Sequence, residues 1–276
     1  MAMKLSFNTW AYSSYPSWLP AYTLEETIKR LAKFGYDGVE IGAASPHAYP
    51  DFLSPQRRTE IKRVLEGEGI ALSSMLPAPS GGPANNPCSP YPEERAYTVE
   101  NYKKIVDLTA EWGGKTVLYI PGWTVFGTPI DQAWAWSVEA LTTIADHAAQ
   151  YGIQLVIEPT SYDSNLVDTG DEAKAMMLQS GRGNVKLMFD TFHVLYRREV
   201  MTDYVYGMGE DLKHIHISEE RRMPPGHGRG DFDSVMDALK DVEFDGYVTL
   251  EIGFDRRDAE PDWFAKEAIS WLKPRA

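Results

Sequence analysis

Cysteine and long apolar runs are what this sequence most clearly lacks. Among its 276 residues only Cys88 is a cysteine, which excludes an intramolecular disulfide and hence a disulfide-stapled secreted scaffold. Cys88 lies in a stretch rich in Pro, Asn and Ser, without a nearby His or Asp to activate it, so we expect an inert thiol. No apolar run approaches the roughly 20 residues that cross a bilayer, and a strand-like run already begins at Lys4, which leaves no room for a signal peptide. We therefore expect a soluble, cytoplasmic protein.

Positive charge is also scarce. The chain has 27 Lys and Arg residues against 40 Asp and Glu, a formal net charge of −13 at pH 7. Nucleic-acid backbones and anionic membranes are bound by cationic faces, so we expect neither as a partner. By contrast, 43% of the residues are hydrophobic, which suits a globular protein with a sizeable core. Aromatic side chains are abundant, with 8 Trp, 15 Tyr and 10 Phe.

Short β-rich runs alternate along the whole chain with segments of helical spacing. The runs cover residues 4–8, 37–42, 70–75, 116–120, 153–158, 185–190, 212–217 and 246–252. The helical segments lie near residues 23–34, 54–68, 93–112, 129–151, 170–180, 199–208, 231–241 and 258–273. Eight such units without a composition break predict an α/β fold, a (β/α)8 TIM barrel with residues 1–276 as a single domain. A doubly wound open sheet is the structural alternative.

One long loop interrupts this regular alternation. Residues 77–92 contain six prolines and two consecutive glycines, and they follow the third predicted strand. In a barrel this loop would lie over the face formed by the carboxyl ends of the strands. Long loops in compact domains are usually functional or mobile. We predict that it covers the active-site face, with a plain surface excursion as the alternative.

Polar residues end four successive predicted strands. Glu158, Asp190, His216 and Glu251 each stand at or beside the carboxyl end of an apolar run. They are separated by 32, 26 and 35 residues, which is one strand–helix unit at each step. We therefore expect the four side chains to meet at one face of the barrel. Taken singly, each could instead be a helix cap or a surface charge.

This set of residue types points to a metal ion. Three carboxylates buried together are costly unless a cation compensates them. Two Glu, one Asp and one His offer mostly oxygen donors, which suit Mn²⁺, Mg²⁺ or Co²⁺ better than a sulfur-rich structural zinc site. The sequence therefore predicts one divalent metal bound at the strand ends.

Further polar residues are candidates for the same cavity. His193 follows Asp190 by three residues, and Arg222 follows His216 by six. Glu40 and Asn8 end the second and first predicted strands, so the same alternation turns them toward the same face. A loop histidine with other partners and a solvated arginine are the plainer interpretations of His193 and Arg222.

Five motifs together resemble a known group of proteins. In chain order the motifs are Val156-Ile-Glu-Pro, Phe189-Asp-Thr-Phe-His193, His214-Ile-His-Ile, the Pro-Gly-x-Gly loop at 225–228, and Leu250-Glu-Ile. With these motifs the chain is similar to the xylose-isomerase-like TIM-barrel superfamily, and most of all to its D-tagatose/D-psicose 3-epimerase group. The likeness in organisation spans the whole chain, whereas the motifs lie within residues 150–252.

The resemblance implies a role for each matching residue. Glu158, Asp190, His216 and Glu251 would bind one divalent metal, Mn²⁺ in the first place and otherwise Mg²⁺ or Co²⁺. Glu158 and Glu251 would also serve as the acid/base pair of a sugar epimerase or isomerase. The metal would acidify a C–H bond beside a ketose carbonyl and stabilise the enediolate, and a carboxylate on each face of that carbon could then move the proton. His193 and Arg222 would hold substrate oxygens.

The first half of the chain departs from the family pattern in its aromatic residues. Aromatic faces stack on sugar rings or on an aromatic aglycone, so Trp10 and Trp123 are candidate substrate contacts. About half of the aromatic residues named at the end of this paragraph should instead pack under loops. We predict a substrate that is a sugar or a larger sugar conjugate. The aromatic residues in question are Trp10, Tyr12, Tyr15, Trp18, Tyr22, Trp123 and Phe126.

Several alternatives use the same residues. A lyase or dehydratase acting on a keto-sugar or 3-keto-glycoside, including C-glycoside cleavage, would need the same metal and Glu pair. A sugar-binding barrel without catalysis is a third reading, opposed by the intact Glu pair. Apurinic endonucleases of the superfamily need extra metal ligands, but here early strands end in Met75 and Ile120, so we reject that activity. Barrels of this type often pair, and the tryptophans near residues 129–151 suggest a homo-oligomer.

Overall fold

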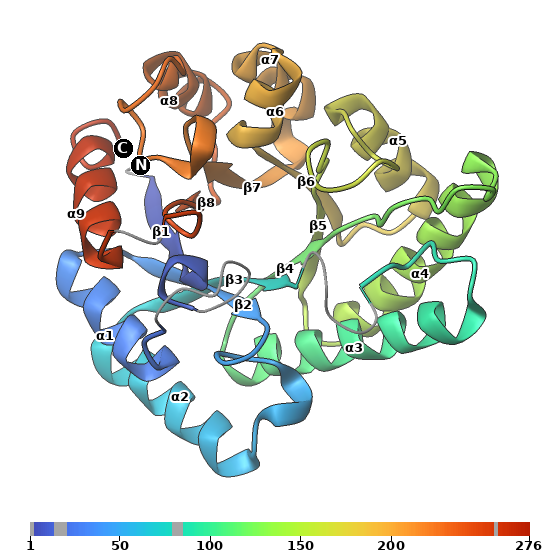
Figure 1. The fold of residues 1–276 in the computed structure, drawn as a ribbon, viewed down its shortest axis with the longest axis horizontal. Helices are drawn as coiled ribbons and strands as arrows, with labels where there is room; N and C mark the ends of the chain where they lie inside the picture. The colour runs from blue at the N-terminus through green and yellow to red at the C-terminus, as the bar shows by residue number, and fades with distance from the viewer. Residues whose placement is uncertain (1–2, 14–20, 79–84, 257–258) are drawn as a thin grey trace.

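The computed structural model describes residues 3–13, 21–78, 85–256 and 259–276. Within these residues eight parallel strands pair in chain order, and the last pairs with the first to close a barrel (Figure 1). The strands are β1 (Lys4–Asn8), β2 (Gly38–Ala43), β3 (Ala71–Pro77), β4 (Thr116–Tyr119), β5 (Gln154–Ile157), β6 (Val185–Asp190), β7 (Leu212–Ile217) and β8 (Tyr247–Leu250). The prediction of a single-domain (β/α)8 barrel is confirmed.

Helices surround the barrel in a ring (Figure 1). In the described part of the chain they are α1 (Leu24–Phe34), α2 (Pro55–Glu68), α3 (Pro92–Glu111), α4 (Ile130–Ala149), α5 (Gly170–Ser180), α6 (Thr191–Arg197), α7 (Met201–Met208), α8 (Phe232–Asp241) and α9 (Pro261–Leu272). Short 3-10 turns cover η1 (Thr9–Tyr12), η2 (Pro50–Phe52), η3 (Gly209–Asp211) and η4 (Glu220–Arg222). The ring positions eight loops at the carboxyl ends of the strands, where barrels of this kind carry their sites.

The sixth unit differs from the prediction. One helix was expected over residues 199–208, which is α7, but α6 precedes it and begins directly after β6. Asp190 ends β6 and also caps α6, because its carboxylate accepts a hydrogen bond of 2.8 Å from the Phe192 N–H. The helix ends at Arg197, and Arg198 caps it with a φ of 60°, which lies in the left-handed region. No Gly or Pro stands at either end of α6, so the sequence has no residue there that signals a helix boundary.

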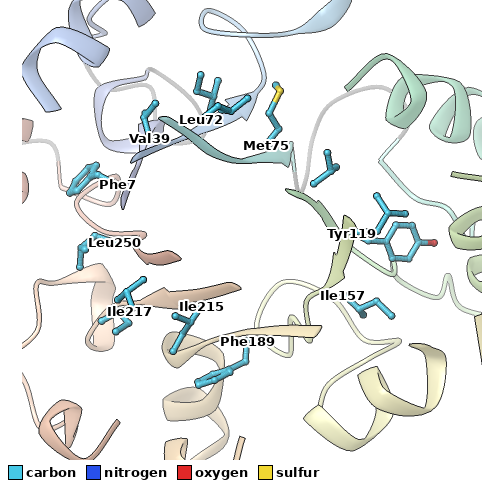
Figure 2. Packing of buried hydrophobic residues seen from close by; sticks show 14 of the residues in the cluster. Phe7, Val39, Leu72, Met75, Tyr119, Ile157, Phe189, Ile215, Ile217 and Leu250 are labelled. Atoms are coloured by element: carbon cyan, nitrogen blue, oxygen red, sulfur yellow. The ribbon is translucent and has the colours of Figure 1, made fainter. Parts of the chain in front are cut away.

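Alternation along the strands separates two apolar layers. Phe7, Tyr119, Ile157 and Phe189 point away from the barrel axis toward the helices, and Figure 2 shows this outer layer. The side chains between them point inward because successive residues of a strand face opposite sides. Within the barrel a second apolar cluster includes Leu118, Val156 and Met188. A strand-end residue that lies two positions after a member of this inner cluster points to the same side, and so it faces the barrel mouth.

Two loops meet at the carboxyl-terminal face beside β3 and β4. The Asn86 side chain donates to the Trp123 carbonyl at 2.9 Å and accepts from the Trp123 N–H at 3.1 Å. Cys88 is fully buried beside them, and burial raises its pKa to about 12, which agrees with an inert thiol. Residues 79–84 of the predicted covering loop lie outside the described residues, so its covering role stays a prediction.

None of the helices in the described ranges is both long and apolar enough to cross a bilayer.

Candidate metal centre and active site

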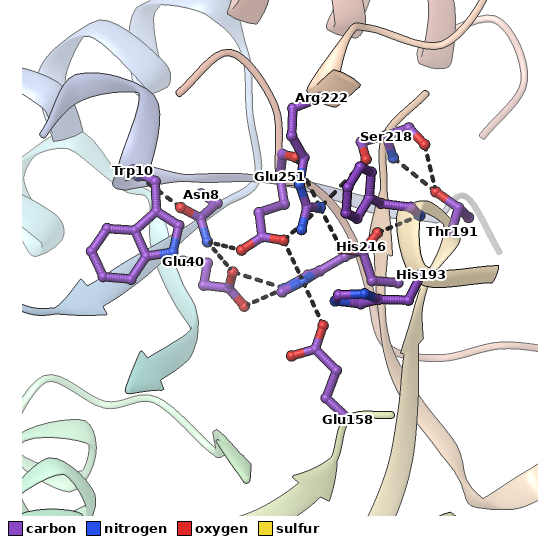
Figure 3. A network of polar contacts seen from close by, with 12 residues as sticks. Asn8, Trp10, Glu40, Glu158, Thr191, His193, His216, Ser218, Arg222 and Glu251 are labelled. Carbon is purple, nitrogen blue, oxygen red and sulfur yellow. Dashed lines mark hydrogen bonds and ion pairs between the residues drawn. The ribbon is translucent and has the colours of Figure 1, made fainter. Parts of the chain in front are cut away.

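Four buried side chains from four neighbouring strands converge at the barrel mouth. Asp190 and His216 lie in β6 and β7, and Glu158 and Glu251 each follow the last residue of β5 and β8. One ligand atom of each lies within 4.8 Å of the others, and all four residues are buried. Glu158 and Glu251 enter from opposite sides of the His216 ring (Figure 3). The four side chains that were selected by their spacing in the sequence thus lie together in the structure.

The His216 ring fits a metal ligand by the state of its two nitrogens. Its Nε2 lies 2.9 Å from Glu40 Oε1, whereas its buried Nδ1 has no hydrogen-bond partner in the described structure. Nδ1 faces Glu158 Oε1 at 3.5 Å and Glu251 Oε2 at 3.3 Å. The charges of Glu40 and Glu251 outweigh burial and raise the pKa of His216 well above its ordinary value, so the free ring is charged and its Nδ1 proton faces the carboxylates. A cation bound at Nδ1 would take the place of that proton, while Glu40 would hold the proton on Nε2. Mostly oxygen donors with one such nitrogen suit a hard divalent cation.

Glu40 lies behind His216 rather than on a substrate-facing wall. It is fully buried, and it contacts His214 Nε2 at 2.9 Å and Ser74 Oγ at 2.6 Å. Burial opposes its ionisation, but the charge of His216 and hydrogen bonds from both imidazoles outweigh burial and hold the pKa of Glu40 well below its usual value. These contacts fix the ring of His216, and a contact between Glu40 and a substrate stays a prediction.

Asn8 connects this buried group to the opposite side of the cluster. Its Nδ2 donates to Glu40 Oε1 at 2.7 Å and lies 3.4 Å from Glu251 Oε1. Its Oδ1 accepts from the Trp10 N–H at 2.7 Å. Both ends of the amide are engaged and 1% of the residue is exposed, so Asn8 orients Glu40 and Glu251. Its contact with a substrate stays a prediction.

Arg222 lies against two of the four converging side chains. Its Nη1 lies 2.8 Å from Glu251 Oε2 and also donates to Asp190 Oδ2. The charges of Arg222 and His216 outweigh burial and lower the pKa of Glu251 to about 2, whereas burial raises the pKa of Glu158 to about 7. Two buried glutamates at one site are thus held with opposite protonation preferences.

His193 lies on α6 rather than in a loop, and 2% of it is exposed. Its Nδ1 accepts from the Tyr162 N–H at 3.2 Å, while its buried Nε2 has no hydrogen-bond partner in the described structure. Burial lowers the pKa of His193 to about 3, so the ring is neutral and its Nε2–H is a donor available to a substrate oxygen.

Asp163 is a site residue that the sequence did not reveal. It follows Glu158 by five residues, and its Oδ2 lies 3.7 Å from His193 Nε2. Burial raises its pKa to about 6, partly offset by Arg222. An acidic residue in a polar loop resembles any solvated charge, and only its position after a barrel strand could have signalled it.

The aromatic residues divide between the core and the barrel mouth. Trp10 is 2% exposed, belongs to the inner cluster with Leu76, Ile120 and Phe254, and lies so close to Gly42 that a Cβ there would come within 2.4 Å of the indole. Trp10 therefore forms part of an apolar wall, and Figure 3 shows it beside Asn8. Trp123 is half-buried and remains a candidate substrate contact.

The other aromatic residues give little support for stacking on a substrate. Tyr12 and Tyr22 donate to Asp262 and Glu260, and Phe126 is fully exposed. Tyr15 and Trp18 lie outside the described residues. Of the aromatic residues singled out in the first half of the chain, Tyr12 and Tyr22 are therefore held by hydrogen bonds to α9 and to the residue before it.

Comparison with known proteins decides the family. The family described as xylose isomerase-like TIM barrel matches residues 28–275. This protein belongs to the xylose isomerase-like TIM-barrel family. Within it, the chain is 30% identical to a D-psicose 3-epimerase of Ruminiclostridium cellulolyticum over 234 residues, covering 81% of this chain and 76% of the relative. It is 29% identical to a D-psicose 3-epimerase of Agrobacterium fabrum over 231 residues, covering 81% and 77%.

A solved structure shares the fold of this xylose isomerase-like barrel. A D-allulose 3-epimerase from Methylomonas in complex with D-allulose superposes with a TM-score of 0.84 at 23% identity, over 100% of this chain and 98% of the other. The resemblance stated from the motifs is confirmed. So is the class of enzyme, since the named relatives are sugar epimerases, and the lyase alternative is not favoured.

Proposed function

We propose that this protein is a divalent-metal-dependent ketose epimerase, with Mn²⁺ as the ion and Mg²⁺ or Co²⁺ as alternatives. The observation that carries the proposal is the buried Nδ1 of His216, which has no hydrogen-bond partner among the described residues. It faces Glu158 and Glu251, and Asp190 lies within the same 4.8 Å cluster. A bound cation would compensate the three carboxylates and would stabilise negative charge developing on two neighbouring substrate oxygens. The sugar epimerases among its relatives support the same class.

The side chains of the site divide the proton chemistry between two faces. Glu158 and Glu251 approach His216 Nδ1 from two different strands, and we place the reacting sugar carbon between their carboxyl groups, one on each face (Figure 3). One glutamate removes the proton beside the carbonyl, and the other returns a proton from the opposite side, which inverts that carbon. The Nε2–H of His193 would hold a substrate oxygen, and Asp163 would accept from a hydroxyl.

Solvent deuterium exchange tests this function directly. Metal-loaded protein in D2O is incubated with D-fructose, D-psicose, D-tagatose and a 3-keto-glucoside, each with Mn²⁺, Mg²⁺ or Co²⁺. We expect loss of the proton signal next to the carbonyl and the growth of an epimer, followed by ¹H NMR. Protein treated with EDTA is the control and should show neither.

Two results would count against the proposal. If no ketose in the panel exchanges with any of the three ions, proton abstraction is refuted. If exchange is accompanied by release of a leaving group from the glycoside, the lyase alternative replaces epimerisation. The cytoplasmic location and a homo-oligomeric state stay predictions.

A further inference from the structure

A second pocket lies beside the cluster of carboxylates. It has a volume of about 780 Å³, and its lining comes from the loops after β5, β6, β7 and β8, which are the four strands that carry Glu158, Asp190, His216 and Glu251. Phe192, which lines this pocket, also contacts the cluster through Arg222. The guanidinium of Arg222 lies 4.1 Å from the ring of Phe192 and contacts Glu251. The pocket and the cluster of carboxylates are therefore neighbours, joined through Phe192 and Arg222.

One side of the pocket is aromatic and open to solvent. Tyr162 is 58% exposed and Tyr196 is 56% exposed. The ring of Tyr162 lies 5.0 Å from Phe192 and 5.2 Å from Tyr196. Three rings held together at the surface offer an apolar face to a flat or carbon-rich group. They belong to the loop after β5 and to α6, on the same side as His193.

The charges of the pocket oppose those of the whole chain. Three arginines, Arg198, Arg221 and Arg256, face two carboxylates, Glu220 and Asp255, although the protein carries a formal net charge of −13. The lining thus has one more positive than negative side chain, which favours an anion over a cation at that place. We call it the arginine pocket.

Two of these arginines are held at an energetic cost and have unused donors. Arg198 and Arg221 have φ values of 60° and 63°, a left-handed conformation that residues other than glycine adopt at a cost. Neither side chain makes a hydrogen bond or ion pair with the residues that the structure describes. Backbone strain combined with free guanidinium donors in a pocket is typical of a binding site rather than of a structural ion pair.

We propose that the arginine pocket binds an anionic group, a phosphate or a carboxylate, carried by the substrate beyond its ketose part, so that the natural substrate is an acidic ketose conjugate. This inference rests on the proposed function, because it takes the metal cluster as the place of the ketose. Guanidinium forks pair with both kinds of anion through charge-assisted hydrogen bonds. The exposed rings would cover the linker between ketose and anion.

Matched pairs of ligands measure the effect of the anion alone. D-Fructose 6-phosphate is compared with D-fructose, and N-(1-deoxyfructosyl)glycine with its glycinamide, which has the same size without the charge. Dissociation constants come from ligand-observed NMR titrations of the metal-loaded protein. We expect the charged member of at least one pair to bind about tenfold or more tightly than its neutral partner, and the pair that responds tells phosphate from carboxylate. The preference should shrink as the ionic strength rises.

Substitutions locate the effect. In the double variant Arg198→Gln, Arg221→Gln the anion preference should fall to about onefold, while Arg221→Lys should retain part of it because it keeps the charge. Arg229→Gln is the matched control, since this exposed arginine lies on the same loop outside the pocket, and it should keep the full preference. Both arginines are exposed, so the variants should fold, as circular dichroism would verify.

Other outcomes would overturn the inference. Equal affinities within both ligand pairs would show that the pocket does not bind the anionic group. A preference for the anion that persists in the double variant would show the same. A change of oligomeric mass in the double variant, by light scattering, would show that the pocket is an interface between copies of the chain. A failure of deuterium exchange with every ketose would instead refute the proposed function, because the titrations do not depend on turnover.

Discussion

Glu158 and Glu251 show how neighbours rather than residue type set acid and base roles. Both are buried glutamates directly after a strand, yet Arg222 and His216 lower the pKa of Glu251 to about 2 and burial raises that of Glu158 to about 7. The difference arises because Arg222 reaches Glu251 at 2.8 Å from one side of the cluster. A bound cation would add its own charge to this balance.

Removing either carboxylate should stop the reaction. We expect Glu158→Gln and Glu251→Gln to reduce epimerisation by about 10²–10⁴-fold at saturating Mn²⁺, because each loses one of two proton-transfer groups. His216→Ala should act differently and chiefly weaken Mn²⁺ binding, as measured by calorimetry. Glu139→Gln, on the exposed face of α4, is the matched control. Full activity in either site variant would refute the assigned roles.

Loops at the carboxyl ends of the strands are fastened to one another by buried polar contacts. His47, in the loop after β2, is 1% exposed, and its Nε2 lies 2.9 Å from the Tyr22 carbonyl just before α1. Burial lowers the pKa of His47 to about 4. The loops after β1 and β2 are therefore joined by a histidine that is neutral in the folded protein.

This contact should make stability depend on pH. Between about pH 4 and the ordinary histidine value of about 6.5, the unfolded chain binds a proton that folded His47 excludes. The contribution of neutral His47 to the free energy of unfolding is therefore full above about pH 6.5 and is lost as the pH falls toward 4. The free energy of unfolding changes by up to about 3 kcal/mol over this range. We expect His47→Gln to flatten this part of the curve, as measured by urea unfolding of EDTA-treated protein. An unchanged slope in the variant would contradict the assignment.

At the scale of the whole molecule, the cluster exists only when the barrel is closed. Its donors lie on four neighbouring strands and are spread over 94 residues, from Glu158 to Glu251. In the unfolded chain these donors are far apart, so a metal that binds all four binds only the folded protein. Metal binding is therefore coupled to stability.

Removal of the metal should lower the melting temperature. At a free ion concentration of about 100 times the dissociation constant, binding adds about 2.7 kcal/mol to the free energy of unfolding. For a domain of this size we expect a rise of roughly 5–10 °C over EDTA-treated protein, read by thermal melting with Mn²⁺, Mg²⁺ and Co²⁺ in turn. His216→Ala should lose most of the shift. The absence of a shift with all three ions would argue against a metal centre.

Particular residues show how far prediction from the sequence extended. The order of strands and the placing of Glu158, Asp190, His216 and Glu251 followed from short-range patterns that the structure keeps. The contacts of Glu40 and Asn8 could not be predicted in this way, because their partners lie on other strands and their burial depends on barrel closure. Helix α6 was missed because Asp190 serves at once as the end of a strand and as a cap.

The sequence by itself determined the number of strand–helix units and which side chains face the barrel interior. Both follow from local rules, since alternation of period two and helical spacing are properties of a few neighbouring residues. Only the tertiary structure decided that Glu40 holds the His216 ring, that Arg222 contacts Glu251 and that Asp163 reaches His193. These contacts join different units, and their distances depend on how the closed barrel positions its loops.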